Sequence, residues 1–533
     1  MNSTEFARTA EKMLRLADKP AGLSTHTSLS VNEKESRLLD GVDGFLEYCV
    51  LRDSTDLWPV HRLDKETTGA IVFARSKEVA EKLRVSFETR DVKKRYLFIT
   101  DRRASQSQYT YESLIEKRGK EFVSTQSQAN NSRTQFKKLG QHETFSLWEA
   151  LPESGRPHQI RLHAQDLGIP ILGDSLHAGS EFPSLCLHSA SIEFSLDGES
   201  IHHESQTPRY FSDLTLLSDR RLCAWLAAID RRERLLKSHC LLKSETLRWI
   251  HTEGDPLRVE QLGSIFHFSW FADQMPSQDE NRSLKRLCEI MGWKDRYLQL
   301  RGDRGRTPNE ERFELSQSDL ALRWTAKERE LEFEFRRDAG LSPGLFLDQR
   351  ANRAFIEGES QKRKVLNLFC YTGGFSVAAA KGGAEKVVSV DVSKTFLEWT
   401  KRNFELNGLA LEPHEFRAID AREYLAWAKK KSLTFDRIIC DPPSFGRSQA
   451  GVFKIEKDLD ALVESLIAVT APHGKILFSL NFEGWDRDEF VSRMQSAAAK
   501  FPQAKLSPTP APDLDFEMPH SERNMKSVLI TIR

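Results

Sequence analysis

The chain lacks the sequence features of membrane proteins and of disulfide-bonded secreted proteins. Its 533 residues contain no apolar run of about 18 residues, the length that spans a bilayer. The segment from Met1 to Lys19 is polar and charged, without the apolar core of a signal peptide. The seven cysteines are scattered, and none forms a CxxC pair, which argues against both a disulfide framework and a zinc site. We therefore expect a cytoplasmic protein without membrane contact and without a metal.

A net charge is also absent. The 78 lysines and arginines offset the 78 aspartates and glutamates, so the overall charge does not indicate a nucleic-acid partner. Binding to RNA or DNA would have to depend on local basic patches. The chain is too long for a single hydrophobic core, and its length predicts about two to four domains.

A charged loop in the first third precedes a strand-like apolar run. The loop, His61–Gly69, places Asp64 between Arg62 and Lys65. Taken alone, such a loop is most often a solvated turn. Two further segments follow in order: Lys94-Arg95-Tyr96, and a run from Arg156 to Arg161 that reads Arg-Pro-His-Gln-Ile-Arg.

These three segments together resemble the RluA family of RNA pseudouridine synthases. A Lys-Pro-x-Gly match at Lys19 and a match through Gly173-Asp174 extend the resemblance to most of the first third. It implies a catalytic domain over residues 1–215 with a mixed, mainly antiparallel sheet. It also implies RNA as the partner and no cofactor, since this isomerisation needs no redox step and no activated donor.

The resemblance assigns roles to single residues. Asp64 is the catalytic carboxylate, Arg161 holds it charged, and Tyr96 stacks on the base. Whether Asp64 attacks the sugar or removes a proton from it stays open. A uridine in structured RNA must first be flipped out. The residues expected to contact the substrate are Arg62, Arg156, His158 and Gln159.

The middle of the chain begins with a basic amphipathic segment. Residues 216–244 carry apolar side chains at helical spacing among several arginines, which predicts a helical connector. Such a helix either packs on a neighbouring domain or contributes to RNA binding, and the sequence leaves both open. Residues 245–335 resemble the small central α/β domain of the ribosomal RNA methyltransferases typified by RlmI and RlmK.

The last third contains a βαβ pattern that ends in an acid. A strand over residues 364–369 leads into Tyr371-Thr372-Gly373-Gly374 and a helix, and the next strand ends at Asp391. An acid there typically holds a ribose. The loop lacks the GxGxxG arrangement that approaches a pyrophosphate, which favours a nucleoside cofactor without phosphates. S-adenosylmethionine fits this pattern better than NAD does.

A second motif, Asp441-Pro442-Pro443-Ser444-Phe445, follows a core strand. With it, residues 336–533 resemble the RlmI/RlmK methyltransferases, which implies a Rossmann-like class I domain and Asp441 as a catalytic residue. The residues expected to hold the cofactor are Tyr371, Thr372, Gly373, Gly374, Phe375, Asp391, Val392, Asp420, Ala421 and Asp441. Those expected to contact the substrate are Gln349, Arg350, Pro442, Pro443 and Phe445. In isolation, the acids would be read as ordinary helix caps or turn residues.

The methylated atom is constrained by cysteine positions. Methylation of cytosine carbon 5 requires a cysteine nucleophile, and the strand over residues 475–481 carries none. Cys370 and Cys440 are interpreted as small apolar fillers. Methylation on nitrogen is therefore favoured, with guanine N7 as the leading expectation.

The leading hypothesis is a multidomain, bifunctional RNA-modifying enzyme. It would isomerise uridine and methylate a base, with 23S ribosomal RNA favoured and transfer RNA as the alternative. Other hypotheses keep one half catalytic with the other as a docking module, or make the chain an RNA chaperone or ribosome assembly factor. A small-molecule methyltransferase is a further alternative. The sequence carries no signal for an oligomeric state.

Overall fold

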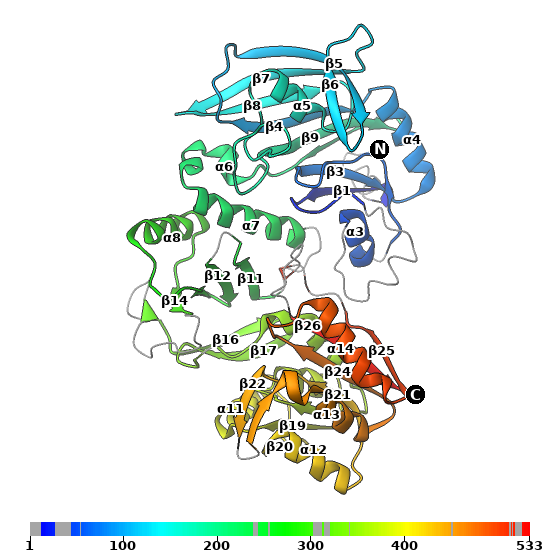
Figure 1. Ribbon diagram of the computed structural model, residues 1–533, viewed down its shortest axis with the longest axis vertical. Helices are drawn as coiled ribbons and strands as arrows, with labels where there is room; N and C mark the ends of the chain where they lie inside the picture. The colour runs from blue at the N-terminus through cyan, green and yellow to red at the C-terminus, as the bar shows by residue number, and fades with distance from the viewer. Residues whose placement is uncertain are drawn as a thin grey trace.

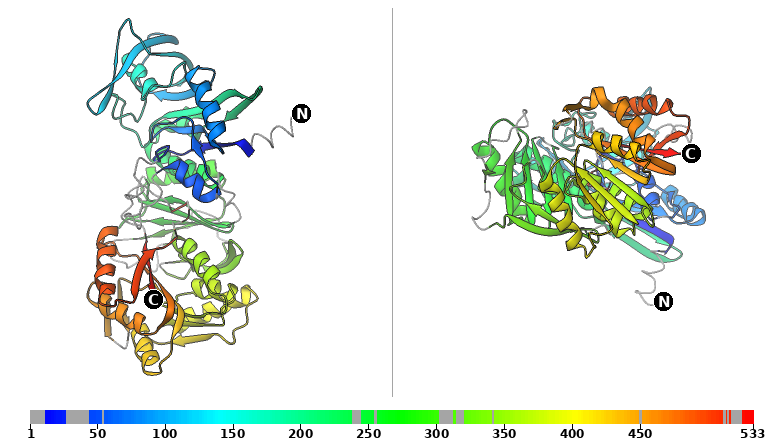
Figure 2. Two further views of the ribbon diagram at one scale, coloured as in Figure 1. Left: turned by 90° about the vertical axis from the view of Figure 1, so that its right-hand side faces the viewer. Right: turned by 90° about the horizontal axis from the view of Figure 1, so that it is seen from below.

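Three sheets follow one another along the long axis of the molecule (Figure 1). The computed structural model describes residues 12–26, 44–53, 55–237, 244–253, 256–301, 312–313, 320–340, 342–448, 451–510, 513, 515–516 and 525–533. Within these ranges, no helix combines the length and apolar character needed to cross a bilayer. The left view of Figure 2 shows the same succession of an N-terminal, a central and a C-terminal part from another side.

The N-terminal sheet has ten strands in the order β1-β3-β9-β4-β8-β7-β5-β6, with β2 beside β3 and β10 beside β9. Only β3 and β9 pair in parallel among them. The expected mixed, mainly antiparallel sheet is therefore confirmed. The strands are β1 (Leu14–Lys19), β2 (Trp58–Pro59), β3 (Thr68–Ala74), β4 (Lys93–Thr100), β5 (Gln108–Arg118), β6 (Glu121–Thr125), β7 (Ser132–His142), β8 (Phe145–Pro152), β9 (Leu187–Leu196) and β10 (Glu199–Glu204).

Helices α3 (Phe45–Asp53), α4 (Lys77–Glu88) and α5 (Gln159–Asp166) accompany this sheet. Helix α4 starts after Ser76, whose side chain accepts a hydrogen bond from the Val79 N–H. The segment after His158 is the helix α5. Helix α6 (Arg209–Ser212) and a 3-10 turn, η1 (Leu214–Ser218), then lead out of the sheet.

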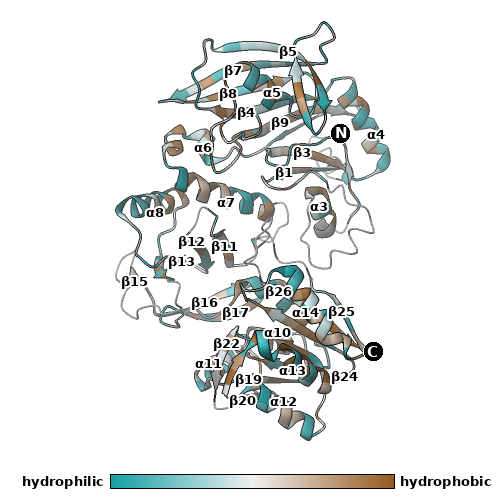
Figure 3. Cartoon of the chain, viewed as in Figure 1, coloured by the Kyte–Doolittle hydropathy of each residue, from teal (hydrophilic) through white to brown (hydrophobic). Residues whose placement is uncertain are grey.

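The predicted connector is the helix α7 (Arg220–Lys237), which lies between the N-terminal and central sheets (Figure 1). Its apolar side chains, Trp225 and Ile229 among them, are buried in a core shared with both neighbours. Figure 3 shows hydrophobic and hydrophilic residues alternating along it. Its arginines bond to acids around it: Arg220 to Glu181, Arg221 to Glu280, Arg232 to Glu253, and Arg234 to Asp230 and Asp18. The structure therefore favours the packing interpretation of this helix over RNA binding.

The central sheet contains β11 (Thr246–His251), β12 (Leu257–Leu262), β13 (Ile265–Trp270), β14 (Arg296–Leu300) and β15 (Arg312–Phe313), with helix α8 (Gln278–Met291). Strand alternation sends Leu257, Val259 and Phe268 into the core with α7 and α8. The opposite face of the sheet is polar. A hairpin of β16 (Arg323–Glu328) and β17 (Leu331–Arg336) leads from this part to the C-terminal one.

The C-terminal sheet has the order β20-β19-β18-β21-β24-β26-β25, and its first five strands are parallel. This is the expected Rossmann-like arrangement. The strands are β18 (Lys364–Leu368), β19 (Lys386–Asp391), β20 (Glu415–Ala418), β21 (Phe435–Cys440), β24 (Thr470–Leu480), β25 (Ala504–Pro508) and β26 (Lys526–Ile532). The chain reverses its order of strand addition between β18 and β21, which is where sheets of this type bind ligands.

Helices α9 (Arg350–Glu359), α10 (Gly374–Lys381), α11 (Lys394–Leu406), α12 (Ala421–Lys430), α13 (Ile455–Ala468) and α14 (Arg487–Ala499) pack on the C-terminal sheet. Two short features flank its ligand-binding edge. The 3-10 turn η3 (Leu347–Gln349) precedes α9, and a hairpin of β22 (Phe445–Ser448) and β23 (Gly451–Lys454) follows β21.

Candidate active sites

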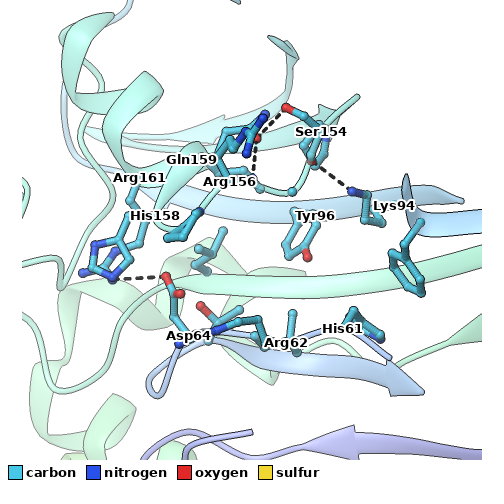
Figure 4. Close-up of a pocket in the computed structure, with 18 of the residues that line it drawn as sticks. His61, Arg62, Asp64, Lys94, Tyr96, Ser154, Arg156, His158, Gln159 and Arg161 are labelled. Atoms are coloured by element: carbon cyan, nitrogen blue, oxygen red, sulfur yellow. Dashed lines mark hydrogen bonds and ion pairs between the residues drawn. The ribbon is translucent and has the colours of Figure 1, made fainter. Parts of the chain in front are cut away.

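A hollow of about 510 Å³ opens in the N-terminal part, between the loop before β3, strand β4 and the start of α5. Figure 4 shows the side chains that line it. All seven residues predicted for this half lie there: Arg62, Asp64, Tyr96, Arg156, His158, Gln159 and Arg161. They come from three segments far apart in the sequence, and the fold brings these segments to one place.

Asp64 is held by a buried arginine. Arg161 Nη1 donates to Asp64 Oδ2 at 3.2 Å, while the opposite edge of the same guanidinium binds a second acid, Asp174. The distances from Nε and Nη2 of Arg161 to the two Asp174 oxygens are 2.7 and 2.6 Å. Burial opposes the charge of Arg161, but the bonds to Asp174 and Asp64 outweigh it and raise its pKa. The arginine is therefore charged and fixed in orientation.

Asp174 is a functional residue that the sequence reasoning did not select, although it ends the third matched segment. Its side chain is fully buried, whereas that of Asp64 is 22% exposed to the hollow. Gly173 adopts a φ of +85°, and a Cβ there would lie 2.1 Å from the Ser184 carbonyl oxygen. Only glycine fits this turn. A glycine directly before an acid in the matched segment could therefore have indicated that the acid is held in a fixed place.

Tyr96 enters the hollow from β4, next to an irregularity in the register between Arg95 and Tyr96. Such a bulge re-aims a side chain relative to its neighbours. Burial raises the pKa of Tyr96 to about 12, although a hydrogen bond to Ser189 acts in the other direction. The phenol is therefore protonated at neutral pH.

The basic residues around β4 divide into two groups. Lys93 pairs with Glu193 at 2.9 Å and Arg95 with Glu149 at 2.6 Å. Arg90 and Lys94 line the hollow instead, together with Arg62 and Arg156. Burial, and then the nearby Arg90, lower the pKa of Lys94 to about 8.

Gln159 lies in the wall of the hollow, but its side chain makes its hydrogen bonds to other groups of the protein. It is 4% exposed, and its Oε1 accepts from Ser154 Oγ and from the Arg156 N–H. Its Nε2 donates to the Arg133 carbonyl oxygen and to Thr134 Oγ1. The geometry therefore gives Gln159 the task of shaping the loop that presents Arg156, in place of the predicted substrate contact.

His158 also has a partner within the protein. It stands at the N-terminus of α5 with a φ of 55°, and its Nδ1 lies 2.9 Å from His177 Nε2. Burial lowers the pKa of both histidines. Both rings are therefore more readily neutral than free imidazole, and His158 still faces the hollow.

In the C-terminal part, Asp441 stands directly after β21, at the carboxyl end of the sheet. Gln349 of η3 donates to its Oδ2 at 2.9 Å. Burial, and then the nearby Asp348, raise the pKa of Asp441 to about 7. The following Pro442 is buried, while Phe445 is 50% exposed at the base of the β22–β23 hairpin. An acid, its hydrogen-bond partner and a half-exposed aromatic ring therefore come from the segments around one strand end: Asp441, Gln349 and Phe445.

Arg350 does not join this group. It is 4% exposed and pairs with Asp515 at 2.8 Å and with Asp513 at 3.4 Å. Its other contacts include the Thr246 carbonyl oxygen, which belongs to the central part. The structure thus places Arg350 in a buried junction between parts of the chain, in place of the predicted substrate contact.

A second hollow, of about 80 Å³, lies beside the ends of β19 and β21. Asp391, Val392, Asp420, Ala421 and Pro443 line it. Asp391 accepts from the Tyr371 and Ser393 N–H groups at 3.0 and 2.9 Å, so its carboxylate is anchored while it borders the hollow. Asp420 borders the same hollow and also caps α12, where its side chain accepts from the Arg422 N–H.

The turn between β18 and α10 contains the remaining predicted cofactor residues. Gly373 has a φ of +79°, and a Cβ there would lie 2.2 Å from Thr400 Cγ2, so the turn requires glycine. Thr372 and Phe375 are 1% and 8% exposed, and their side chains pack inside the protein. Of these two residues, only the backbone is available to a ligand. An acid for a ribose, an apolar slot and a glycine turn without a phosphate cradle fit S-adenosylmethionine.

The cysteines near this edge are unsuited to nucleophilic attack. Cys370 and Cys440 are buried, and burial raises both thiol pKa values well above their usual range. Among the described residues, no group of three or more His, Cys, Asp or Glu side chains is arranged to hold a metal.

Comparisons with known proteins divide the chain in the same way. Residues 14–166 match the family described as RNA pseudouridylate synthase, and residues 257–517 match the family described as S-adenosylmethionine-dependent methyltransferase. These matches confirm the two family resemblances seen in the sequence, one in each half of the chain.

The relatives match only part of the chain. Ribosomal RNA large subunit methyltransferase K of Neisseria meningitidis is 40% identical over 157 residues, which are 29% of this chain and 44% of that protein. Ribosomal RNA large subunit methyltransferase K/L of Hahella chejuensis is 34% identical over 225 residues, or 41% of this chain and 31% of that protein. The chain thus spans less than half the length of each of these relatives. The solved methyltransferase SMU.776, complexed with SAH, shares the fold at a TM-score of 0.51 and 24% identity, over 58% of this chain and 82% of that one.

Proposed function

We propose that this chain, which joins a member of the RNA pseudouridylate synthase family to a member of the S-adenosylmethionine-dependent methyltransferase family, modifies RNA at two sites. The first half isomerises a uridine to pseudouridine. The second half methylates a base, for which guanine N7 is favoured. The names of the relatives support the ribosomal RNA of the large subunit as the substrate.

The observation that carries the first activity is the Asp64–Arg161–Asp174 chain. An isomerisation needs no atoms from outside, so one fixed carboxylate that acts on the nucleoside is sufficient. Asp64 is open to the hollow, and its ion pair with Arg161 holds it in one orientation. Tyr96, which stays protonated, stacks on the flipped base. Arg62 and Arg156, both exposed at the rim, bind the neighbouring phosphates.

The second activity rests on the edge of the parallel sheet. When bound there, S-adenosylmethionine supplies an activated methyl group. Asp391 holds the ribose, and Val392, Asp420 and Ala421 border the base. The target base stacks on Phe445, and the ionised Asp441 accepts from one of its N–H groups. Gln349 keeps Asp441 turned towards that base.

Methylation on nitrogen is supported by the state of the thiols. Cytosine carbon 5 needs a thiolate to add to the ring first. Cys370 and Cys440 are buried and their pKa values are raised, so neither supplies one. Guanine N7 carries its own lone pair, so the chain needs only to position the base against the methyl donor.

Two single variants of the full chain test the proposal. We expect Asp64→Asn to abolish pseudouridine formation in a large-subunit RNA transcript while leaving methylation intact. Asp441→Ala should do the reverse. The exposed Asp166, on α5, provides a matched control as Asp166→Asn, which should retain both activities. A wild-type chain that forms neither mark, or an Asp64→Asn variant that still forms pseudouridine, would refute the assignment.

A further inference from the structure

The polar face of the central sheet lies against the methyltransferase part. Arg248, Arg258 and Glu260 project from this face because they alternate with the buried apolar residues of β11 and β12. Arg248 stacks on the ring of Phe516, and Gln299 of β14 donates to the Gly340 carbonyl oxygen at 2.7 Å. Both partners lie outside the central sheet. This face therefore forms one wall of a junction.

Most charged groups on this face are satisfied by one another. Arg248 donates to Glu260 at 2.6 Å and contacts His251, and Glu260 also lies 3.6 Å from His267. Arg258 is the exception. Within the part of the chain that the structure describes, its guanidinium makes no hydrogen bond or ion pair, and its Nε is buried without a partner. Its one close contact is the Phe271 ring, 4.7 Å from the guanidinium carbon to the ring centroid.

The Arg258 guanidinium thus lies over a ring with its donors unused. Burial, and then the like charge of Arg248, lower its pKa to about 10. The positive charge is therefore maintained at a cost to folding. An arginine on an ordinary surface places its guanidinium in water, because its aliphatic stem is flexible.

The methyl-transfer site lies on the other side of this junction. Strand β11 packs against η3, which carries Asp348 and Gln349. Asp348 acts electrostatically on both Arg258 and Asp441. Arg301, at the end of β14, acts in the same way on Tyr371 of the cofactor turn. Arg258, Arg301 and Asp348 are each partly exposed, so the junction is open to solvent.

We infer that Arg258 binds a backbone phosphate of the RNA strand next to the base held at Asp441, with Arg301 beside it. A planar guanidinium with unused donors matches two phosphate oxygens, and the half-buried setting strengthens the pair. This inference rests on the proposed methyltransferase function. The same chemistry would suit one other anion, the carboxylate of the cofactor's methionine moiety, and the experiment separates the two.

The experiment uses the full chain, a large-subunit RNA transcript and S-adenosylmethionine. Arg258→Ala should raise the KM for RNA in methyl transfer about tenfold, since a charge-assisted contact to one phosphate is lost. The slope of log KM against log salt should fall by about one. We expect kcat and the Kd of S-adenosylmethionine to change less than twofold. The Tm should stay equal or rise, because an unsatisfied charge has been removed. Arg258→Lys should recover part of the KM.

Two controls accompany these variants. Arg282, on α8, has a side chain that is 79% exposed, and Arg282→Ala should leave every quantity unchanged. Pseudouridine formation by Arg258→Ala should equal that of the wild type, which shows that the transcript and the N-terminal half are intact.

Three results would overturn the inference: an unchanged KM, a weaker binding of S-adenosylmethionine with an unchanged KM, or a lower Tm with equal losses in both activities. The second would assign Arg258 to the cofactor, and the third would make it structural. If the wild type transfers no methyl group, the proposed function fails. Filter binding of the transcript to wild type and to Arg258→Ala then still decides whether Arg258 contacts RNA.

Discussion

Replacing Asp174 by asparagine tests the idea that a buried acid positions the catalytic pair. Asparagine keeps the shape of the side chain but removes the charge that faces Nε and Nη2 of Arg161 at 2.7 and 2.6 Å. One of the two bonds then meets an amide N–H, so a charge-assisted bond worth about 1.5–3 kcal/mol is lost. If all of this misplaces Arg161, kcat for pseudouridine formation falls about 10- to 150-fold.

The assay for this variant separates positioning from binding and from folding. We expect the KM for RNA to stay within about twofold, because Asp174 is fully buried and does not line the hollow. The free energy of unfolding of the N-terminal part should fall by about 3 kcal/mol, since the arginine keeps a buried, weakened partner. Asp166→Asn, on the helix that carries Arg161, is the control and should change stability by less than about 0.5 kcal/mol. A kcat within threefold of wild type, together with a lower Tm, would show that Asp174 only stabilises the domain.

Three further outcomes follow from the two sites. Methyl transfer should fall as the pH drops through about 7, because protonated Asp441 no longer accepts from the base; a flat profile from pH 6 to 8.5 would contradict this role. The same raised pKa means that Asp441 lowers the stability of the folded state progressively as the pH rises from about 4 to about 7, so Asp441→Asn should raise the Tm at pH 8 more than at pH 5, as followed by thermal melting. Cys370→Ala and Cys440→Ala should each keep methyl transfer within about threefold, and loss of a 5-methylcytosine mark in either variant, detected by mass spectrometry, would refute methylation on nitrogen.

Lys19→Met tests whether the buried Lys19 amine holds the Asp64 loop in place. Lys19 is fully buried, and its Nζ donates to the carbonyl oxygens of Pro20, Leu23 and Lys65. Removal of the amine leaves three buried acceptors without a donor, at about 1–3 kcal/mol for each. We expect a lower Tm and slower pseudouridine formation with unchanged methylation. Unchanged pseudouridine formation would show that the Asp64 loop is held by its other contacts.

The parts predicted well from the sequence are those in which local chemistry dictates the position. The run Ala70–Ala74 predicts a buried strand, Ser76 predicts a helix start, and Asp441 follows an apolar strand, which places it at the sheet edge. The Asp64 and Arg161 pairing follows from the motifs, and the structure joins them across 97 positions of sequence.

The predicted site residues whose side chains turn into the protein share one physical reason. Gln159, Arg350, Thr372 and Phe375 stand within motifs, and a motif shows which residues occur together but not which way each side chain points. Tertiary packing decided that Gln159 supports a loop and that Arg350 pairs with Asp515. Arg258 gave no signal at all, because Leu-Arg-Val-Glu is an ordinary strand alternation. Its significance appears only when the partners of its neighbours are known.

The central claim is that one chain makes two marks in one RNA, and mapping both marks in a deletion strain tests it most directly. Pseudouridine and methylated bases would be mapped in ribosomal and transfer RNA from the deletion strain complemented with wild type, Asp64→Asn or Asp441→Ala. We predict that the deletion loses one or more pseudouridines and one methylated guanine in large-subunit ribosomal RNA. Each variant should restore only the mark of the other half. Restoration of both marks by both variants, or a deletion strain that loses neither mark, would contradict the account.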